Sequence, residues 1–115
     1  MSAPPSSLQQ HFALTLARFI TRINELGWKV TFGEAYRPPE TAALYAQQGR
    51  GIKNSLHSSR LAMDLNIFNS DNEYIEKTDE LEMVGAIWEA QDALATWGGR
   101  FGDGNHFSFG FEGRK

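Results

Sequence analysis

One stretch of the sequence decides the fold: Ser55-Leu56-His57-Ser58-Ser59-Arg60-Leu61-Ala62-Met63-Asp64-Leu65-Asn66-Ile67-Phe68. From Leu61 onward apolar residues recur at every second position, which predicts a strand with one face toward the core. His57 and Asp64 are seven positions apart, and in a flat strand an odd spacing points two side chains to opposite faces. The two side chains therefore converge only if His57 lies on a bend before the strand, formed by Ser58 to Arg60.

Three helices are predicted around this stretch, over residues 8–26, 40–48 and 79–97. Apolar residues in the first recur at spacings of three and four, which is typical of an amphipathic helix. Asp79 is the expected N-cap of the third helix, and Leu94 and Ala95 belong to its expected inner face. Each helix is expected to end at a glycine, which suits the C-terminal position of a helix: Gly27, Gly49 and Gly98.

Strands are predicted over residues 28–32, 61–68 and 106–111, the last from alternating phenylalanines after a glycine-rich turn. Helices and strands that alternate in this way predict an α+β fold, with a small antiparallel sheet backed by helices. Residues 1–115 are expected to form one domain, in which residues 1–7, rich in proline and serine, are a flexible leader.

The composition excludes several classes of protein. The 115 residues are 41% hydrophobic with a net charge of −3, so neither a nucleic-acid binder nor a disordered chain is expected. The absence of cysteine excludes disulfides and thiolate ligands. The first residues lack the features of a signal peptide, and no run is long enough to span a membrane. A monomer that stays in the cytoplasm of the cell that makes it is therefore expected.

The chemistry-bearing residues suggest a metal site. His106 begins the last strand, where it is able to meet His57 and Asp64, and two histidines with one aspartate suit a catalytic Zn²⁺ that keeps one open position. Asp103, in a turn between glycines, is placed to act as a general base on water. Taken singly, Asp103 is equally a turn residue, His106 a strand-end histidine and Asp64 a buried carboxylate with satisfied hydrogen bonds.

The motifs together resemble a known family. They are Ser55-x-His57 with Ala62-x-Asp64, then Trp97-Gly98-Gly99 and Asp103-x-x-His106-Phe107, preceded by Tyr36-Arg37-Pro38-Pro39-Glu40 and Leu44-Tyr45-Ala46-Gln47-Gln48-Gly49-Arg50. This order resembles the zinc D-Ala-D-Ala carboxypeptidase and L-alanyl-D-glutamate peptidase family, peptidase family M15, whose small members include phage endolysins. The resemblance runs from about Val30 to Phe109 and implies the Hedgehog/D-Ala-D-Ala-peptidase type of fold.

The resemblance also implies roles for single residues. His57, Asp64 and His106 would bind zinc, and Asp103 would be the catalytic base. Arg37 would stabilise a substrate carboxylate or the developing oxyanion, and Ser55 would hydrogen-bond the substrate. The sequence departs from the family pattern after His57, because Arg60 stands where the family usually has glycine.

The expected function is hydrolysis of an amide bond in the stem peptides of peptidoglycan, as a phage L-alanyl-D-glutamate endopeptidase. Such an enzyme would accumulate in the host bacterial cytoplasm and reach the cell wall after release, causing cytolysis. Two alternatives stand beside it: a D-alanyl-D-alanine carboxypeptidase or dipeptidase, and an inactive wall-binding or phage structural module. For the carboxypeptidase, both Arg37 and Arg60 are candidates to bind the terminal carboxylate.

Overall fold

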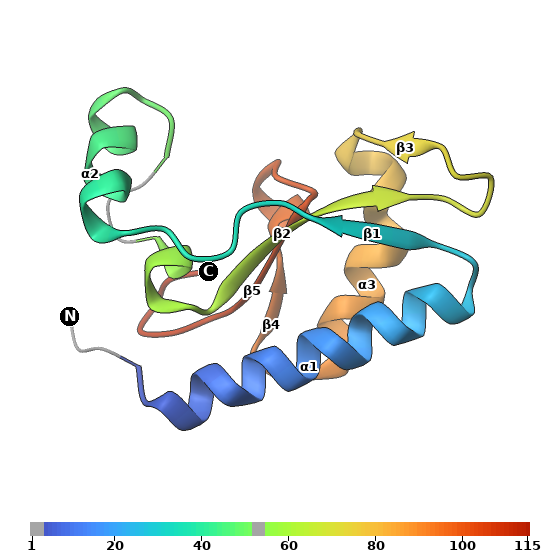
Figure 1. Cartoon of the computed structure of the whole chain (residues 1–115), viewed down its shortest axis with the longest axis horizontal. Coiled ribbons are helices and arrows are strands. Elements are labelled where there is room, and N and C mark those ends of the chain that lie inside the picture. Colours follow the sequence, from blue (N-terminus) through green and yellow to red (C-terminus); the bar gives the residue numbers. More distant parts are fainter. Residues whose placement is uncertain (1–3, 52–54) are drawn as a thin grey trace.

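The computed structural model describes residues 4–51 and 55–115, and within them the chain has an α+β fold. This part of the chain has three α-helices and a five-stranded antiparallel sheet (Figure 1). The helices are α1 (Ser6–Glu25), α2 (Pro39–Gln47) and α3 (Glu82–Gln91). The strands are β1 (Lys29–Phe32), β2 (Ala62–Phe68), β3 (Tyr74–Ile75), β4 (Ala95–Trp97) and β5 (His106–Phe109). The predicted fold class is confirmed.

The strand predicted from the opening stretch is the centre of the sheet. The strand order is β1-β2-β5-β4, and β3 pairs with the end of β2. β2 therefore pairs with β1 along Leu65–Phe68 and with β5 along Ala62–Asp64. Its residues Leu65 and Ile67 are buried, as the alternation predicts.

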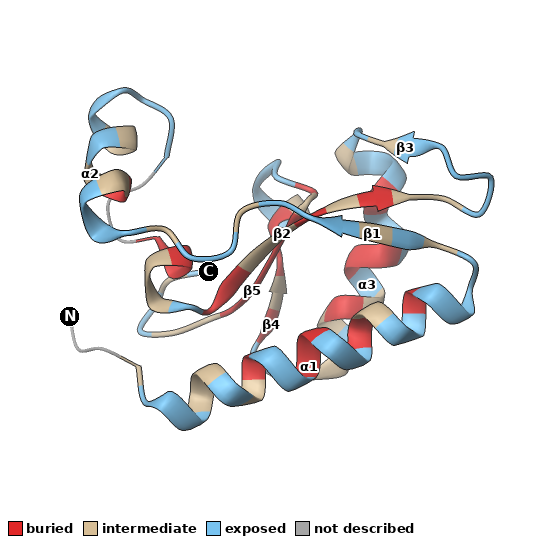
Figure 2. Cartoon of the chain, viewed as in Figure 1, coloured by how far each residue is buried: buried red, intermediate tan, exposed pale blue. Residues whose placement is uncertain are grey.

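The core lies between the sheet and two of the helices. Figure 1 shows α1 running along the sheet with α3 close to it, whereas α2 stands apart at the end far from β3. Buried residues gather on the inner faces of α1 and α3 and along the central strands (Figure 2). Edge-to-face and stacked aromatic rings join these layers: Phe12, Phe19, Trp88, Phe107 and Phe109.

Several predicted elements differ from the structure. The helix predicted from Asp79 is wrong at both ends, because a 3₁₀ turn (Thr78–Leu81) precedes α3 and the helix stops at Gln91. Asp79 therefore does not cap it, and Leu94 and Ala95 lie in the following turn and in β4. The stop is local: the Asp92 side chain accepts a hydrogen bond from the backbone N–H of Leu94 at 2.9 Å, which turns the chain into β4.

Smaller differences concern exposure and the leader. α1 begins at Ser6, so the predicted leader is too long by two residues, and its residues 1–3 lie outside the described part of the chain. Phe32, at the end of the edge strand β1, is 68% exposed. Only Ala42 of α2 is buried, so α2 adds little to the core.

Candidate metal centre and active site

His57 lies on the bend that the spacing requires. A 3₁₀ turn, Leu56–Ser59, carries it, and Ser55 caps this turn by accepting a hydrogen bond from the backbone N–H of His57 at 3.1 Å. Arg60 then takes the left-handed conformation, with φ of 56° and ψ of 34°, and the chain enters β2. Glycine adopts this conformation at least cost, which explains physically why a glycine suits the position.

Asp64 and His106 meet through the register of the sheet. The two residues are direct partners in the antiparallel pairing of β2 with β5, and directly opposed side chains of a sheet lie on the same face. The backbone of Asp64 is also fixed from the other side, where its N–H donates to the carbonyl of Glu34 and its carbonyl accepts from Gly33, both at 2.8 Å. Two of the three predicted ligands are thus placed by backbone pairing alone.

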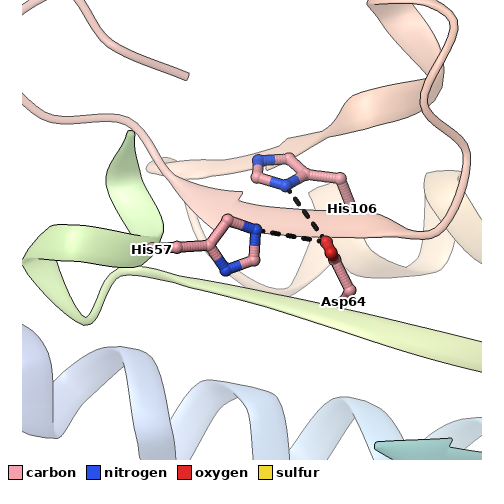
Figure 3. Close-up of side chains that lie close together, drawn as sticks. All are labelled: His57, Asp64 and His106. Carbon is pink, nitrogen blue, oxygen red and sulfur yellow. Dashed lines mark ion pairs between the residues drawn. The ribbon is translucent and has the colours of Figure 1, made fainter. Parts of the chain in front are cut away.

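The three predicted ligands converge on one point. One oxygen of Asp64, Oδ1, lies 3.2 Å from His57 Nε2 and 3.4 Å from His106 Nδ1, and the three ligand atoms lie within 4.8 Å of one another. Figure 3 shows that a nitrogen of each imidazole ring points toward the carboxylate of Asp64. Within the described residues this is the group of histidines and carboxylates that could hold a metal ion.

The donor set fits Zn²⁺. Asp64 Oδ1 is buried and has no hydrogen-bond partner among the described residues, although two nitrogens face it. A tetrahedral ion about 2.0–2.1 Å from its ligands would hold those ligands about 3.3 Å apart. The two separations from Asp64 Oδ1 agree with that value, and oxygen with imidazole nitrogen is a usual ligand set for zinc.

A hydrogen bond on the side of the ring away from Asp64 fixes the orientation of His57. Its Nδ1 lies 2.8 Å from the carbonyl oxygen of Ala35, so Nδ1 carries the proton and donates it. The lone pair of Nε2 then faces Asp64 and His106, as in histidines that bind metals. The His106 ring is held by edge contacts with the rings of His57 and Phe101, at 5.1 and 5.8 Å between centroids.

The charges of the site shift the pKa values of its members. Burial would raise the pKa of Asp64, but its contacts with His106 and His57 lower it to about 2. Burial also opposes a charged His57, yet the contact with Asp64 and its negative charge raise the pKa of this imidazole above 6.5. Asp64 is therefore ionised at neutral pH, which is the state that a metal ligand requires.

Asp103 lies beside this group in a firmly held loop. It lines the same pocket of about 260 Å³ as His57, Asp64 and His106. The indole Nε1 of Trp97 donates to the carbonyl of Gly104 at 2.7 Å, and the Gly104 N–H donates to the hydroxyl of Thr78 at 3.2 Å. Burial raises the pKa of the Asp103 carboxyl, which strengthens it as a base.

Arg37 lines the pocket but is already paired. Its Nε donates to Glu34 Oε1 at 2.6 Å, and its Nη2 forms an ion pair with the same oxygen. Ser55 also lines the pocket, buried, with its hydroxyl oxygen used as the cap of the His57 turn. The structure thus brings all six predicted site residues together around one cavity.

Two neighbours of the site were missed from the sequence. Glu34 holds Arg37, and Arg50 lines the pocket from the end of α2. Both lie in loops, and the acidic residue three positions before Arg37 was the available signal for the first. Arg60 points elsewhere: its guanidinium lies 4.0 Å from the Tyr36 ring centroid, beside a separate pocket of about 450 Å³ next to α1.

Comparisons with known proteins agree with this site. A family model described as D-alanyl-D-alanine carboxypeptidase matches residues 48–109, which is more than half of the chain and includes His57, Asp64, Asp103 and His106. The chain therefore belongs to this family of M15 peptidases.

One solved structure defines the fold more closely. The crystal structure of Serratia marcescens L-Ala D-Glu endopeptidase ChiX superposes with a TM-score of 0.61 at 18% identity, over 72% of this chain and 68% of that chain. No curated protein sequence gives a significant match. Within the described residues, no helix is long and apolar enough to cross a membrane.

Proposed function

We propose that this peptidase is zinc-dependent and cleaves the L-Ala–D-Glu amide bond in the stem peptides of peptidoglycan. The observation that carries the proposal is the convergence of His57, Asp64 and His106 from three separate segments, with Asp103 in the same pocket. The shared fold with an L-Ala D-Glu endopeptidase supports the choice of bond. D-Ala-D-Ala carboxypeptidase activity is the second candidate, favoured by the description of the matching family model.

The metal would be held by His57 Nε2, Asp64 Oδ1 and His106 Nδ1. When bound, zinc polarises a carbonyl group and lowers the pKa of water to about 7, so that water becomes a nucleophile at neutral pH. Three protein ligands leave a position open for this chemistry, whereas a structural site would be closed by a fourth.

The other side chains then have distinct tasks. Asp103 accepts the proton of the attacking water and returns it to the amine as the C–N bond breaks, and its raised pKa suits both transfers. Glu34 contacts Nε and Nη2 of Arg37 but not Nη1. The Nη1 group is therefore available to donate to the carbonyl oxygen of the scissile amide as negative charge develops on that oxygen. The Ser55 hydroxyl, which accepts from His57, retains its proton for a hydrogen bond to the substrate.

The experiment combines metal analysis with product analysis. We expect purified protein to bind one zinc and to release new amino termini at D-Glu from peptidoglycan, detected by mass spectrometry. Asp103→Asn is expected to keep the metal and lose hydrolysis, whereas His57→Ala is expected to lose both. His11→Ala is the matched control, because His11 pairs with Asp92 outside the pocket. Release of D-Ala alone would establish the carboxypeptidase instead, and full activity of Asp103→Asn would exclude Asp103 as the base.

The proposal extends to the biological role. We propose that the protein is a monomeric phage endolysin that acts on the host cell wall, a role supported by the resemblance of its motifs to small endolysins of the family. Production in a bacterium together with a pore-forming protein is expected to cause lysis, and the Asp103→Asn variant is expected not to. Sedimentation analysis tests the monomer.

A further inference from the structure

The cationic side chains around the site pocket differ in what holds them. Arg37, Arg50 and Lys115 all line it. The charge of Arg37 is balanced by Glu34, which contacts two of its nitrogens. In the described part of the chain, the Lys115 ammonium group has no hydrogen bond or ion pair, so nothing fixes its position. Arg50, although exposed, has neutral partners that orient it and no ion pair among the described residues.

Neutral groups hold Arg50 in place. Its guanidinium carbon lies 4.4 Å from the centroid of the Tyr45 ring, and its Nη1 donates to Gln48 Oε1 at 3.0 Å. Its backbone N–H donates to the carbonyl of Tyr45 at 2.7 Å. These partners orient the guanidinium without cancelling its charge, and within residues 4–51 and 55–115 no carboxylate forms an ion pair with it. A guanidinium stacked on an aromatic ring is well suited to bind a carboxylate with two hydrogen bonds.

Helix α2 explains why this arrangement exists. Only Ala42 of its nine residues is buried, and the helix stands apart from the sheet (Figure 2). Its Tyr45 ring, however, contacts both arginines, with the Arg37 guanidinium carbon at 5.2 Å from the ring centroid. The helix contributes little to the core and much to the wall of the pocket, so its main contribution is to position these side chains.

We propose that Arg50 is a specificity-determining residue that binds a free carboxylate of the substrate next to the scissile amide. The inference rests on the proposed function, in which D-Glu supplies a carboxylate beside the bond that is cleaved. Arg37, already balanced by Glu34, suits a neutral carbonyl oxygen, whereas Arg50 suits an anion. Although the net charge of the chain is −3, a positive group in this pocket attracts an anionic peptide locally.

Two peptides that differ in one group test the inference. The first contains L-Ala–D-Glu with the D-Glu carboxylate free, and the second carries the carboxamide there. Wild-type protein is expected to show kcat/KM at least about tenfold higher for the acid, the effect of one charge-assisted contact. In Arg50→Met the ratio of the two kcat/KM values is expected to fall to within about twofold of unity, because kcat/KM decreases for the acid peptide alone. Arg50→Lys is expected to restore part of the ratio. Arg18→Met, which removes an exposed charge of α1 outside the pocket, is expected to keep the wild-type ratio.

Binding to the metal-free protein separates this inference from the proposed function. Calorimetric titration with both peptides is expected to show the same acid preference in the wild type and its loss in Arg50→Met. A preference of this kind without any cleavage upholds the role of Arg50 and refutes the proposed activity. Cleavage of both peptides with equal kcat/KM, or an acid preference that persists in Arg50→Met, overturns the role of Arg50 and leaves the activity standing.

Discussion

Replacing Gly98 by alanine is expected to disturb the loop that carries Asp103 and His106. A Cβ atom at Gly98 would lie 2.3 Å from the carbonyl oxygen of Asp103 and 2.6 Å from the Cβ of His106. Both atoms belong to the backbone or to the root of a side chain, so no rotamer change relieves the contact. Ordinary contact begins at 3.4 Å, and the Asp103 carbonyl must therefore move by about 1 Å.

The size of the effect follows from this displacement. Overpacking of a buried position costs about 1–3 kcal/mol, and each kcal/mol lowers the Tm of a domain of this size by about 4 °C or more. Activity should suffer more than stability, because a shift of about 1 Å in a catalytic group reduces the rate roughly 100-fold. The hydrogen bond from the Asp103 N–H to the Gly98 carbonyl, 2.9 Å long, would be strained at the same time.

Thermal unfolding, monitored by circular dichroism, measures the effect on stability, and the rate of peptide hydrolysis measures the effect on activity. Gly110→Ala is the matched control: this glycine lies just after β5, its added Cβ would approach no atom closer than 3.4 Å, and its φ is not in the left-handed region. We expect the control to unfold within about 2 °C of the wild type and to remain active. If Gly98→Ala proved as stable and as active as Gly110→Ala, the close packing inferred for the Asp103 loop would be wrong.

Three further predictions concern charges and backbone conformation. Zinc affinity, measured by calorimetry, is expected to fall as the pH drops through the raised pKa of His57, because protonation removes the ligand. In metal-free protein the same raised pKa adds stability below pH 6.5, and this stability is lost as the pH rises through the pKa of His57 in the folded state. Thermal unfolding of metal-free protein should therefore show the opposite pH trend to zinc affinity. Arg60→Ala is expected to be about 1 kcal/mol less stable than Arg60→Gly in denaturant titrations, because only glycine relieves the left-handed conformation. Asp92→Ala should lower stability by about 1 kcal/mol, since the residue contacts His11 at 2.6 Å and caps the turn after α3; an unchanged Tm would contradict this.

The sequence predicts the centre of the fold well because local pattern and tertiary environment agree there. β2 alternates in hydrophobicity and is half buried, and α1 has one apolar stripe that faces the core. The odd spacing of His57 and Asp64 is a purely geometric constraint, and the 3₁₀ turn ending at Arg60 satisfies it. The convergence of the predicted metal ligands was accessible for the same reason.

The elements that the sequence did not predict depend on distant partners. β3 and β4 have two and three residues, and each exists because a neighbouring strand supplies its hydrogen bonds. No glycine or proline marks the end of α3, and its apolar pattern runs on into β4, so the turn at Asp92 is the one weak signal that the sequence carries there. The sequence predicted no role for Arg50, because it shows neither that this residue lines the pocket nor that, among the described residues, no carboxylate pairs with it.

Contacts of the fold itself hold the three proposed ligands. Backbone pairing places Asp64 opposite His106, and the Ala35 carbonyl orients His57, so each ligand is held by contacts that do not involve a metal. The Asp64 oxygen that faces both histidines is buried and ionised, and a buried negative charge is stabilised by a cation. We therefore expect the proposed binding of zinc to need little rearrangement, so that its free energy appears almost entirely as affinity and stability, in contrast to small domains that fold only when the metal binds.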